Sequence, residues 1–342
     1  MIDDPRLAGY SLEPLGGGWS GETFVAVPSH GRGEDRLVVR YFADARHAPG
    51  AARIQAALLD SVRDVLPVPV VRMVHDGDAG LPGLLVTELL PGERGDLALA
   101  RLVGGGGDAG GRTTDLRTIG RALGGVAGTL AAIPMPRAGM FVDAHLRIEP
   151  FHLWLPDWVD AHAHRLAEDD WSDGEVASLR ALAERAASDL AGAPPCLVHS
   201  DLNPKNVLVD PATLQVTGVL DWEFAHAGHP ATDLGNLLRF DREPAYVEGV
   251  LDGFLAGLDA SAATGTGANV DTETGTDTDT GANERSGAGE PGRRRATDLA
   301  RAADLVALVD LAARRAANPV VRQARAHLRA IARSGDVHAV PD

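Results

Sequence analysis

Residues 194–221 read PPCLVHSDLNPKNVLVDPATLQVTGVLD, and this stretch decides the fold that we expect. Within it, His199, Asp201 and Asn206 form the pattern H-x-D-x-x-x-x-N, which the apolar run V-L-V follows at once. After an Asp-Pro turn, a second apolar run ends on Asp221. The pattern therefore predicts two short strands with two carboxylates and a carboxamide at their ends.

Oxygen-bearing side chains at these positions suit phosphoryl transfer, in which a hydroxyl is aligned with a departing phosphate and metal ions are held by oxygen ligands. On this hypothesis Asp201 takes up the proton of the hydroxyl, while Asn206 and Asp221 hold Mg²⁺. The H-x-D-x-x-x-x-N pattern alone arises by chance in roughly a few per cent of chains of this size. The V-L-V run, the turn and the sequence V-L-D-W-E that follow make it far more specific.

This stretch resembles the catalytic and metal-binding loops of protein-kinase-like enzymes, and among them the aminoglycoside phosphotransferase family. The resemblance implies an α+β, two-lobed fold with a small antiparallel-sheet N-terminal lobe and a mainly helical C-terminal lobe. It implies a nucleotide-binding lobe over 1–92 and a catalytic and substrate lobe over 93–258, completed by C-terminal helices over 297–342. The implied cofactors are ATP, or GTP, and Mg²⁺.

The N-terminal segment SLEPLGGGWSGETFVAV, residues 11–27, predicts a strand, a glycine-rich turn and a second strand. Glycines let the backbone approach a phosphate closely, and its N–H groups then donate to the phosphate oxygens. The candidate nucleotide-binding residues here are Gly17, Gly18, Ser20 and Gly21. A plain hairpin with no ligand is the alternative.

The next predicted strand, RLVVRYF, places Arg40 where a nucleotide lobe needs a cation for the phosphates. The resembling enzymes carry lysine there, whereas this chain has a single lysine, Lys205. Arginine is charged and bidentate but bulkier than lysine. On the helix predicted over 50–65, Gln55 stands where the family has the glutamate that pairs with this cation. We therefore expect an Arg40–Gln55 hydrogen bond that is weaker than an ion pair.

The resemblance implies further roles by position in the chain. Glu88 and Leu90, at a predicted strand end, would offer backbone groups to adenine, although an ordinary strand end is the alternative. Lys205 would reach a phosphate, and a solvated position is equally open. His199 is expected to be architectural. Asp233, in the sequence D-L-G, is expected to accept backbone hydrogen bonds from the catalytic loop and hold it rigid.

Residues 154–175, WLPDWVDAHAHRLAEDDWSDGE, carry seven acids and one arginine with three tryptophans between them. One hypothesis is a helical insertion that shapes a substrate cleft and binds a cationic molecule, with Asp157 and Asp160 as substrate residues. A solvated helix pair with tryptophans in the core is the alternative. Glu223, two residues after Asp221, is a further candidate metal or substrate carboxylate.

The formal net charge of −16 argues against nucleic-acid binding and is compatible with a cationic small-molecule substrate. With Cys196 as the one cysteine, no internal disulfide is possible, and its place in the apolar run C-L-V predicts a buried thiol rather than a nucleophile. The sequence shows no apolar run of bilayer length and no signal peptide, so we expect no membrane association and a cytoplasmic location. It leaves the oligomeric state open.

Two segments are predicted to lack regular structure. Residues 104–111, GGGGDAGG, read as a flexible loop, and residues 259–296 are rich in Thr, Gly, Asp and Ala with almost no large apolar side chain. Such a composition buries too little surface to offset chain entropy, which predicts a disordered linker. Between them, Gly124, Gly125 and Gly128 lie in a predicted helix and suggest close helix packing.

These observations predict an enzyme that transfers the γ-phosphate of ATP, in line, to a hydroxyl of a small, cationic molecule. An aminoglycoside or a basic peptide antibiotic would be such a molecule, and the enzyme would then confer antibiotic resistance. One alternative is a kinase of a metabolite such as choline, homoserine or a sugar. Another is a non-catalytic, nucleotide-binding pseudokinase. Arg40 and Gln55 favour the pseudokinase, whereas the joint retention of Asp201, Asn206 and Asp221 argues against it.

Overall fold

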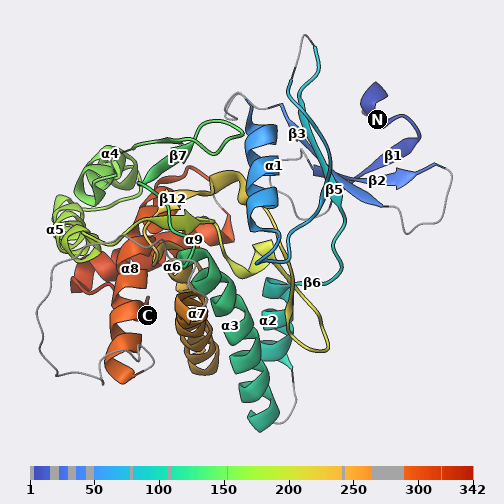
Figure 1. The fold of residues 1–342 in the computed structure, drawn as a ribbon. Helices are drawn as coiled ribbons and strands as arrows, with labels where there is room; N and C mark the ends of the chain where they lie inside the picture. Colours follow the sequence, from blue (N-terminus) through green and yellow to red (C-terminus); the bar gives the residue numbers. More distant parts are fainter. Residues whose placement is uncertain are drawn as a thin grey trace, which may run out of the picture. The chain divides into compact units, whose positions relative to one another are not determined.

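The computed structural model describes residues 4–15, 23–29, 36–43, 50–77, 80–105, 109–151, 153–240, 243–263, 289–316 and 318–341. The chain divides into two compact units, whose elements are labelled in Figure 1. Unit 1 comprises Met1–Ala100, Met140–Glu149 and Pro204–Ala225, and unit 2 comprises Arg101–Gly139, Pro150–Asn203 and His226–Asp342.

Unit 1 contains a five-stranded antiparallel sheet in the order β1-β2-β3-β5-β4. Its strands are β1 (Tyr10–Pro14), β2 (Thr23–Pro28), β3 (Leu37–Phe42), β4 (Val71–His75) and β5 (Gly83–Glu88). Among them are the two strands expected within residues 11–27, the strand expected at RLVVRYF and the strand expected to end near Glu88, and the predicted small antiparallel sheet is confirmed. The glycine-rich turn, with Gly17, Gly18, Ser20 and Gly21, lies outside the described residues.

Alternation along β3 divides its side chains between the two faces of the sheet. Val39 and Tyr41 are buried in a cluster with Leu84 and Val86 of β5, so Arg40 points to the opposite face. In register, Arg40 lies opposite Thr23, the first residue of β2 after the glycine-rich segment. The sheet thus brings the strand cation next to the first described residue after that segment.

Helix α1 (Ala51–Val62) packs against β4 and β5. It follows Gly50, whose positive φ of 77° turns the chain into the helix, a conformation that glycine adopts at little cost. Its buried stripe includes Leu58, Leu59 and Val62, at the spacing of one helix face. Gln55 lies in the same stripe and is 7% exposed, so its amide is inside the unit.

A second sheet completes unit 1 with strands from distant parts of the sequence. In it, β10 (Val207–Val209) pairs with both β11 (Val216–Val219) and β6 (Glu93–Arg94). The hairpin of β7 (Gly139–Phe141) and β8 (Ile148–Glu149) supplies another part of the unit. The expected boundary at residue 92 therefore does not coincide with the units, because backbone pairing with β6 assigns 204–225 to unit 1.

Unit 2 is mainly helical, as the resemblance implied. Its largest apolar cluster joins α4 (Leu155–Ala167), α5 (Asp173–Leu190), α8 (Glu290–Ala313) and α9 (Pro319–Ser334). Helix α5 begins with a capping box in which Ser172 and Glu175 each accept a hydrogen bond from the backbone of the other. Trp171 is 6% exposed in this cluster, whereas Trp154 at the start of α4 is 48% exposed.

Helices α3 (Ala109–Ala131) and α7 (Pro244–Ala263) pack with their backbones in close approach (Figure 1). Every fourth residue at the contact is glycine, on α3 and on α7 alike. A Cβ atom added to Gly124 would overlap the backbone of Val250, and one added to Gly253 would overlap Arg121. The expected close packing is confirmed for Gly124 and Gly128, whereas Gly125 faces open space.

Both predicted irregular segments contain more helix than expected. Gly104 ends α2 (Gly95–Gly104), and Gly110 and Gly111 lie in α3, so the expected loop at 104–111 is wrong at both ends. Likewise α7 extends to Ala263 and α8 begins at Glu290, because alanine and arginine are good helix formers and Arg293 forms an ion pair with Asp252 of α7. Residues 264–288 of the predicted linker lie outside the described residues.

In the described part of the chain, none of the helices has the length and hydropathy needed to cross a lipid bilayer.

Candidate phosphotransfer site

The β10–β11 hairpin brings two candidate metal ligands to one end of a small sheet. Val207 pairs with Val219, and one residue further out the Leu220 N–H donates to the Asn206 carbonyl oxygen at 2.8 Å. Asn206 ends the short helix η2 (Pro204–Asn206) and is 6% exposed, and Asp221 follows Leu220 directly. The hairpin register therefore fixes Asn206 and Asp221 at adjacent positions in unit 1.

Asp221 adopts a left-handed backbone conformation, with φ 65° and ψ 62°. Aspartate tolerates this region better than most residues, and such conformations are typical of functional turns. It precedes the short helix η3 (Trp222–Phe224), in which Trp222 is buried and its indole N–H donates to the Val219 carbonyl at 3.1 Å. Packing of Trp222 thus anchors the turn that carries both Asp221 and Glu223.

The strand cation and these two carboxylates form one cluster. Arg40 Nη1 donates to Asp221 Oδ1 at 2.6 Å, and Arg40 Nη2 donates to Glu223 Oε2. The Arg40 side chain is 13% exposed, against 38% for Asp221 and 27% for Glu223. Burial alone lowers the pKa of Arg40, but the Asp221 and Glu223 charges outweigh it, so the pKa stays above its ordinary value.

The expected hydrogen bond between Arg40 and Gln55 is not formed among the described residues. Both terminal nitrogens of Arg40 are directed to Asp221 and Glu223 instead. The physical reason is charge, since two carboxylates attract a guanidinium more strongly than a neutral amide does. Sequence reasoning missed Glu223 as a partner of Arg40 because the two residues are 183 positions apart and only the fold brings them together.

Asn206 and Asp221 fit a magnesium ion that arrives with a phosphate. Both supply oxygen, and Mg²⁺ in phosphate-binding sites takes only one or two protein ligands, with phosphate and water oxygens completing the shell. The described residues include no cluster of three or more His, Cys, Asp or Glu arranged to hold a metal by themselves. A pair of oxygen donors of this kind would suit a metal that arrives with a phosphate.

The predicted adenine contacts lie at the end of β5, where Glu88 is the last residue of the strand and Leu90 follows two residues later. The Glu88 N–H already donates to the Val70 carbonyl at 3.0 Å, and its carboxylate pairs with Arg72. In contrast, the backbone N–H and C=O of Leu90 have no hydrogen-bond partner within the described chain. Leu90 is thus the better placed of the two to offer backbone groups to a ligand. Lys205 lies in η2 with an exposed side chain, directly before Asn206.

In unit 2, Asp233 holds the first half of the catalytic loop. It lies near the start of α6 (Thr232–Leu238), is 1% exposed, and accepts the backbone N–H groups of His199 and Ser200, each at 2.8 Å. Burial raises the pKa of Asp233, while His199 and these two hydrogen bonds act in the opposite direction. This is the geometry expected of a residue that rigidifies the loop.

Asp201 follows two residues later. Its N–H donates to Nδ1 of the fully buried His199 at 3.3 Å, and its carboxylate Oδ1 accepts from Asn203 Nδ2 at 2.8 Å. Ser200 between them has a positive φ of 66°. His199 therefore contacts the backbone of the loop, as an architectural residue does. Asn203, which orients the Asp201 carboxylate, was not singled out from the sequence, and its spacing carries no distinctive signal.

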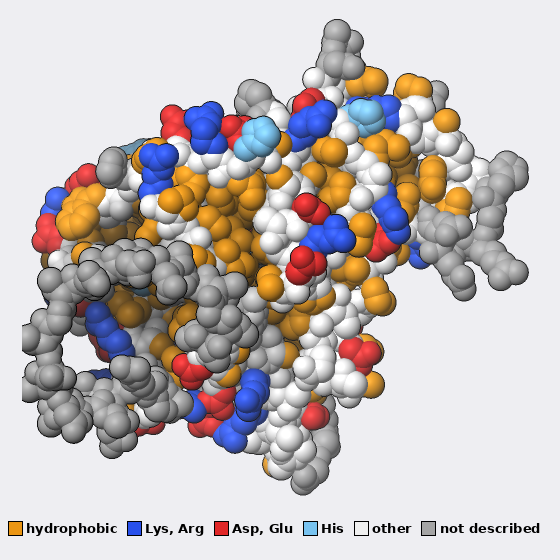
Figure 2. Space-filling model, in the orientation of Figure 1, with side chains coloured by type: hydrophobic (Ala, Val, Ile, Leu, Met, Phe, Trp, Pro, Cys, Tyr) orange, Lys and Arg blue, Asp and Glu red, His pale blue; other side chains and the backbone are white. Residues whose placement is uncertain are grey.

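The acidic segment 154–175 is largely neutralised inside unit 2. Four of its acids form ion pairs with arginines of α5, of α9 and of the turn after α8: Asp160 with Arg180, Glu168 with Arg315, Asp169 with Arg325, and Glu175 with Arg329 and Arg333. Figure 2 likewise shows acidic and basic side chains interspersed on the face in view. The alternative of a helix pair with a tryptophan in the core describes most of the segment, and Asp160 is already paired. Asp157 is exposed and has no ion pair within the described residues.

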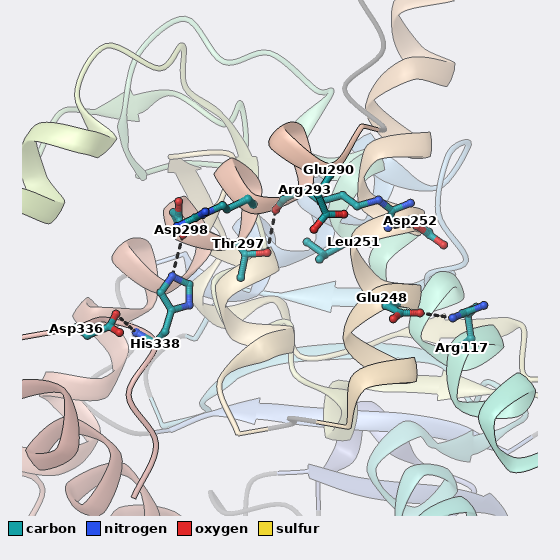
Figure 3. Close-up of a pocket in the computed structure, with 11 residues that line it drawn as sticks. Arg117, Glu248, Leu251, Asp252, Glu290, Arg293, Thr297, Asp298, Asp336 and His338 are labelled. Carbon is teal, nitrogen blue, oxygen red and sulfur yellow. Dashed lines mark hydrogen bonds and ion pairs between the residues drawn. The ribbon is translucent and has the colours of Figure 1, made fainter. Parts of the chain in front are cut away.

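A polar cavity of about 850 Å³ lies elsewhere in unit 2, between α7, α8 and the C-terminal segment (Figure 3). Two ion pairs line it, Arg117–Glu248 and Arg293–Asp252, together with a hydrogen bond between His338 Nε2 and Asp298 Oδ1 at 2.8 Å. None of the predicted site residues lines this cavity. Several of its charged side chains are already paired with one another, and its lining has no surplus of positive charge that would attract a phosphate.

Cys196 lies in β9 (Cys196–Val198), which pairs with β12 (His226–Gly228), and its side chain is buried as predicted. Burial, reinforced by the charge of Asp233, raises the pKa of the thiol to about 12. A thiol with this pKa is not a nucleophile at neutral pH.

The comparison with protein families agrees with this arrangement. The model of the phosphotransferase enzyme family, APH, matches residues 11–264. The chain belongs to this family. The match includes the strand cation, the H-x-D-x-x-x-x-N loop and Asp221, so the APH resemblance is confirmed over most of the chain.

Solved structures show the same fold. An aminoglycoside phosphotransferase, APH(4)-Ia, in a ternary complex with ADP and hygromycin B has a TM-score of 0.56 at 19% identity, covering 96% of both chains. A protein of Ralstonia eutropha provisionally assigned as an aminoglycoside phosphotransferase has a TM-score of 0.57 at 16% identity, covering 95% of this chain and 91% of that one. Macrolide 2'-phosphotransferase MphH of Brachybacterium faecium has a TM-score of 0.52 at 20% identity, covering 93% and 90%. The two-lobed kinase-like fold is thereby confirmed.

Curated relatives match only a short piece of this APH-family chain. Acyl-CoA dehydrogenase family member 11 of mouse is 47% identical over 45 residues, and the rat protein is 44% identical over 45 residues. These matches cover 13% of this chain and 6% of the length of those proteins.

Proposed function

We propose that this APH-family protein is a magnesium-dependent kinase that transfers the γ-phosphate of ATP to a hydroxyl of a small molecule. The observation that carries the proposal is the cluster of Arg40 with Asp221 at the end of the β10–β11 hairpin that also carries Asn206. It combines a cation for phosphates with oxygen ligands for the metal that accompanies them. When bound, Mg²⁺ would neutralise charge on the phosphates.

In this proposal Asp201 is the base. Its carboxylate is held by Asn203, and the loop that carries it is fixed by Asp233, so it is oriented before any substrate binds. It would accept the proton of the acceptor hydroxyl as the oxygen attacks phosphorus. Since phosphoryl transfer passes through a loose transition state, orientation and charge supply most of the rate enhancement.

The acceptor that we favour is cationic. The net charge of −16 would attract a positive molecule, and Asp157 is an exposed carboxylate with no internal ion pair in the described chain. One structural relative, APH(4)-Ia, was solved in complex with hygromycin B. The ion pairs of Glu168, Asp169 and Glu175 limit the acidic surface available to such a substrate.

The test is a product assay with MgATP and a panel of acceptors: aminoglycosides, basic peptide antibiotics, choline, homoserine and simple sugars. Mass spectrometry would detect the gain of one phosphoryl group on the acceptor. We expect phosphorylation of at least one cationic member. Phosphorylation of only uncharged acceptors would overturn the cationic preference, and MgATP binding without product from any acceptor would favour the pseudokinase.

A further inference from the structure

The ion pair between Arg40 and Glu223 indicates a role for Glu223, to which the family pattern assigns none. We infer that Glu223 is the charge partner that positions Arg40 for the nucleotide phosphates. This inference rests on the proposed function, because it concerns the same cation and the same ligand. It differs from the expectations for Glu223 as a metal ligand or a substrate carboxylate.

The first argument is that the two terminal nitrogens of Arg40 donate to two different carboxylates. A guanidinium presents two terminal nitrogens along different directions, and here Nη1 is directed to Asp221 and Nη2 to Glu223. A metal that engages Asp221, or a phosphate that engages Nη1 of Arg40, would leave the contact between Nη2 and Glu223 in place. Arginine thus offers a separate nitrogen to each partner, which suits a cation that one carboxylate holds while its other nitrogen acts on a ligand.

The second argument is that the helix α1 residue expected to pair with Arg40, Gln55, carries no charge. Gln55 is buried, and no hydrogen bond joins it to Arg40 within the described residues. The Arg40 side chain is 13% exposed, and a cation so little hydrated needs a compensating charge nearby. Asp221 is the proposed metal ligand, so it cannot be the permanent partner. Glu223 is the remaining carboxylate paired with Arg40.

The third argument is that one rigid turn carries both Asp221 and Glu223. Glu223 belongs to η3, whose buried Trp222 is anchored to Val219 of β11, and helix α1 packs against η3. Asp221 precedes the same turn. One rigid turn therefore supplies both the carboxylate that holds Arg40 and the carboxylate proposed for the metal. Their separation is fixed by local chain geometry, so it does not depend on where α1 lies.

The test measures the affinity for Mg–AMP-PNP by calorimetry, which needs no acceptor. Loss of a hydrogen bond to a charged group predicts that Glu223→Gln weakens binding roughly tenfold or more. The matched control is Glu184→Gln, which removes a carboxylate from an exposed ion pair with Arg180 in unit 2 and should leave the affinity unchanged. Circular dichroism and thermal unfolding establish that each variant is folded.

A double-mutant cycle separates positioning from direct ligand contact. If Glu223 acts through Arg40, Glu223→Gln causes no further loss of affinity in an Arg40→Met background. A further tenfold loss there would show that Glu223 contacts metal or nucleotide itself, and it would overturn the inference. Glu223→Asp, which keeps the charge on a shorter side chain, replaces Glu223→Gln in the cycle if the latter does not fold.

The outcomes distinguish this inference from the proposed function. If the wild-type protein binds Mg–AMP-PNP and phosphorylates an acceptor while Glu223→Gln binds the nucleotide equally well, only the role of Glu223 is rejected. If the wild-type protein binds no nucleotide in the presence of Mg²⁺, the proposed function itself is rejected.

Discussion

Arg40 on β3 and Asp221 after β11 are 181 positions apart in the chain, yet an ion pair of 2.6 Å joins them. This pair links the strand cation to the proposed metal ligand within one compact unit.

The first prediction follows from the proposed role of Asp221 as a metal ligand. Asp221→Ala should remove the response of nucleotide binding to Mg²⁺, so that affinities measured with Mg²⁺ and with EDTA become equal. Asp76→Ala, which breaks an exposed ion pair with Arg53 in the same unit, is the control and should keep the full magnesium response. Retention of that response in Asp221→Ala would contradict its role as a ligand.

The second prediction concerns Asp201. Asparagine in its place keeps an oxygen that can accept from Asn203 Nδ2 but can no longer take up a proton. With an acceptor identified by the product assay, Asp201→Asn should lower kcat roughly a thousandfold or more while nucleotide affinity stays within a factor of about two. An unchanged kcat would show that another group, or none, acts as the base.

The third prediction uses neighbouring glycines of α3 that face different surroundings. Gly124→Ala would place a methyl group against the backbone of Val250 on α7, whereas Gly125→Ala would place it in open space. Chemical denaturation should show Gly124→Ala destabilised by about 2 kcal/mol or more, because two backbones must separate. Gly125→Ala should be stabilised by up to about 1 kcal/mol through its better helix propensity. Equal effects would mean that the α3–α7 contact is looser than the structure shows.

The fourth prediction is a pH dependence at His229. Burial, with a smaller contribution from Arg295, lowers the pKa of His229 to about 4, and its Nδ1 accepts from the Ala231 N–H at 3.0 Å. The unfolded chain takes up a proton near the ordinary pKa of about 6.5, but the folded chain does not until about pH 4. Neutral His229 therefore contributes to the folding stability above about pH 6.5. This contribution is lost as the pH falls from about 6.5 to about 4, by at most about 1.4 kcal/mol per pH unit.

His229→Asn tests this assignment, since asparagine supplies a similarly placed acceptor oxygen that does not titrate. Urea unfolding at several pH values between 4 and 7 should show a flatter pH dependence in the variant than in the wild-type protein. Identical slopes would assign the acid sensitivity to other groups.

The fifth prediction uses Cys196 as a natural reporter. With a pKa of about 12, roughly one thiol in ten thousand is ionised at pH 8, and the side chain is also 2% exposed. A thiolate-specific reagent should label the native protein only at the rate of unfolding, and labelling should become fast in denaturant. Rapid, stoichiometric labelling of the native protein would contradict the burial of β9.

Local pattern predicted much of this molecule. The run L-V-V-R-Y-F gave β3 and the place of Arg40 on it, and the spacing around Asn206 and Asp221 gave the hairpin, because strand period and turn chemistry are encoded within a few residues. The fold class followed from one loop through its resemblance to a family.

The ion-pair partners of charged side chains were predicted poorly where the two residues lie far apart in the sequence. Glu223 as the partner of Arg40 depends on a register that no local pattern contains. The acidic segment looked unpaired because its arginines, such as Arg325 and Arg333, come from a helix more than 150 residues later. In both cases the sequence showed the charges, but only the packing shows which of them are already neutralised.

Unit 1 is assembled from three separate stretches of the chain, the last of which ends at Ala225. During translation, its first stretch, which carries β6, leaves the ribosome before β10, the strand that pairs with β6, has been made. Until then β6 lacks β10, and unit 1 is incomplete. A gene fragment that stops near residue 100 would encode this unfinished intermediate and not a separable nucleotide-binding domain.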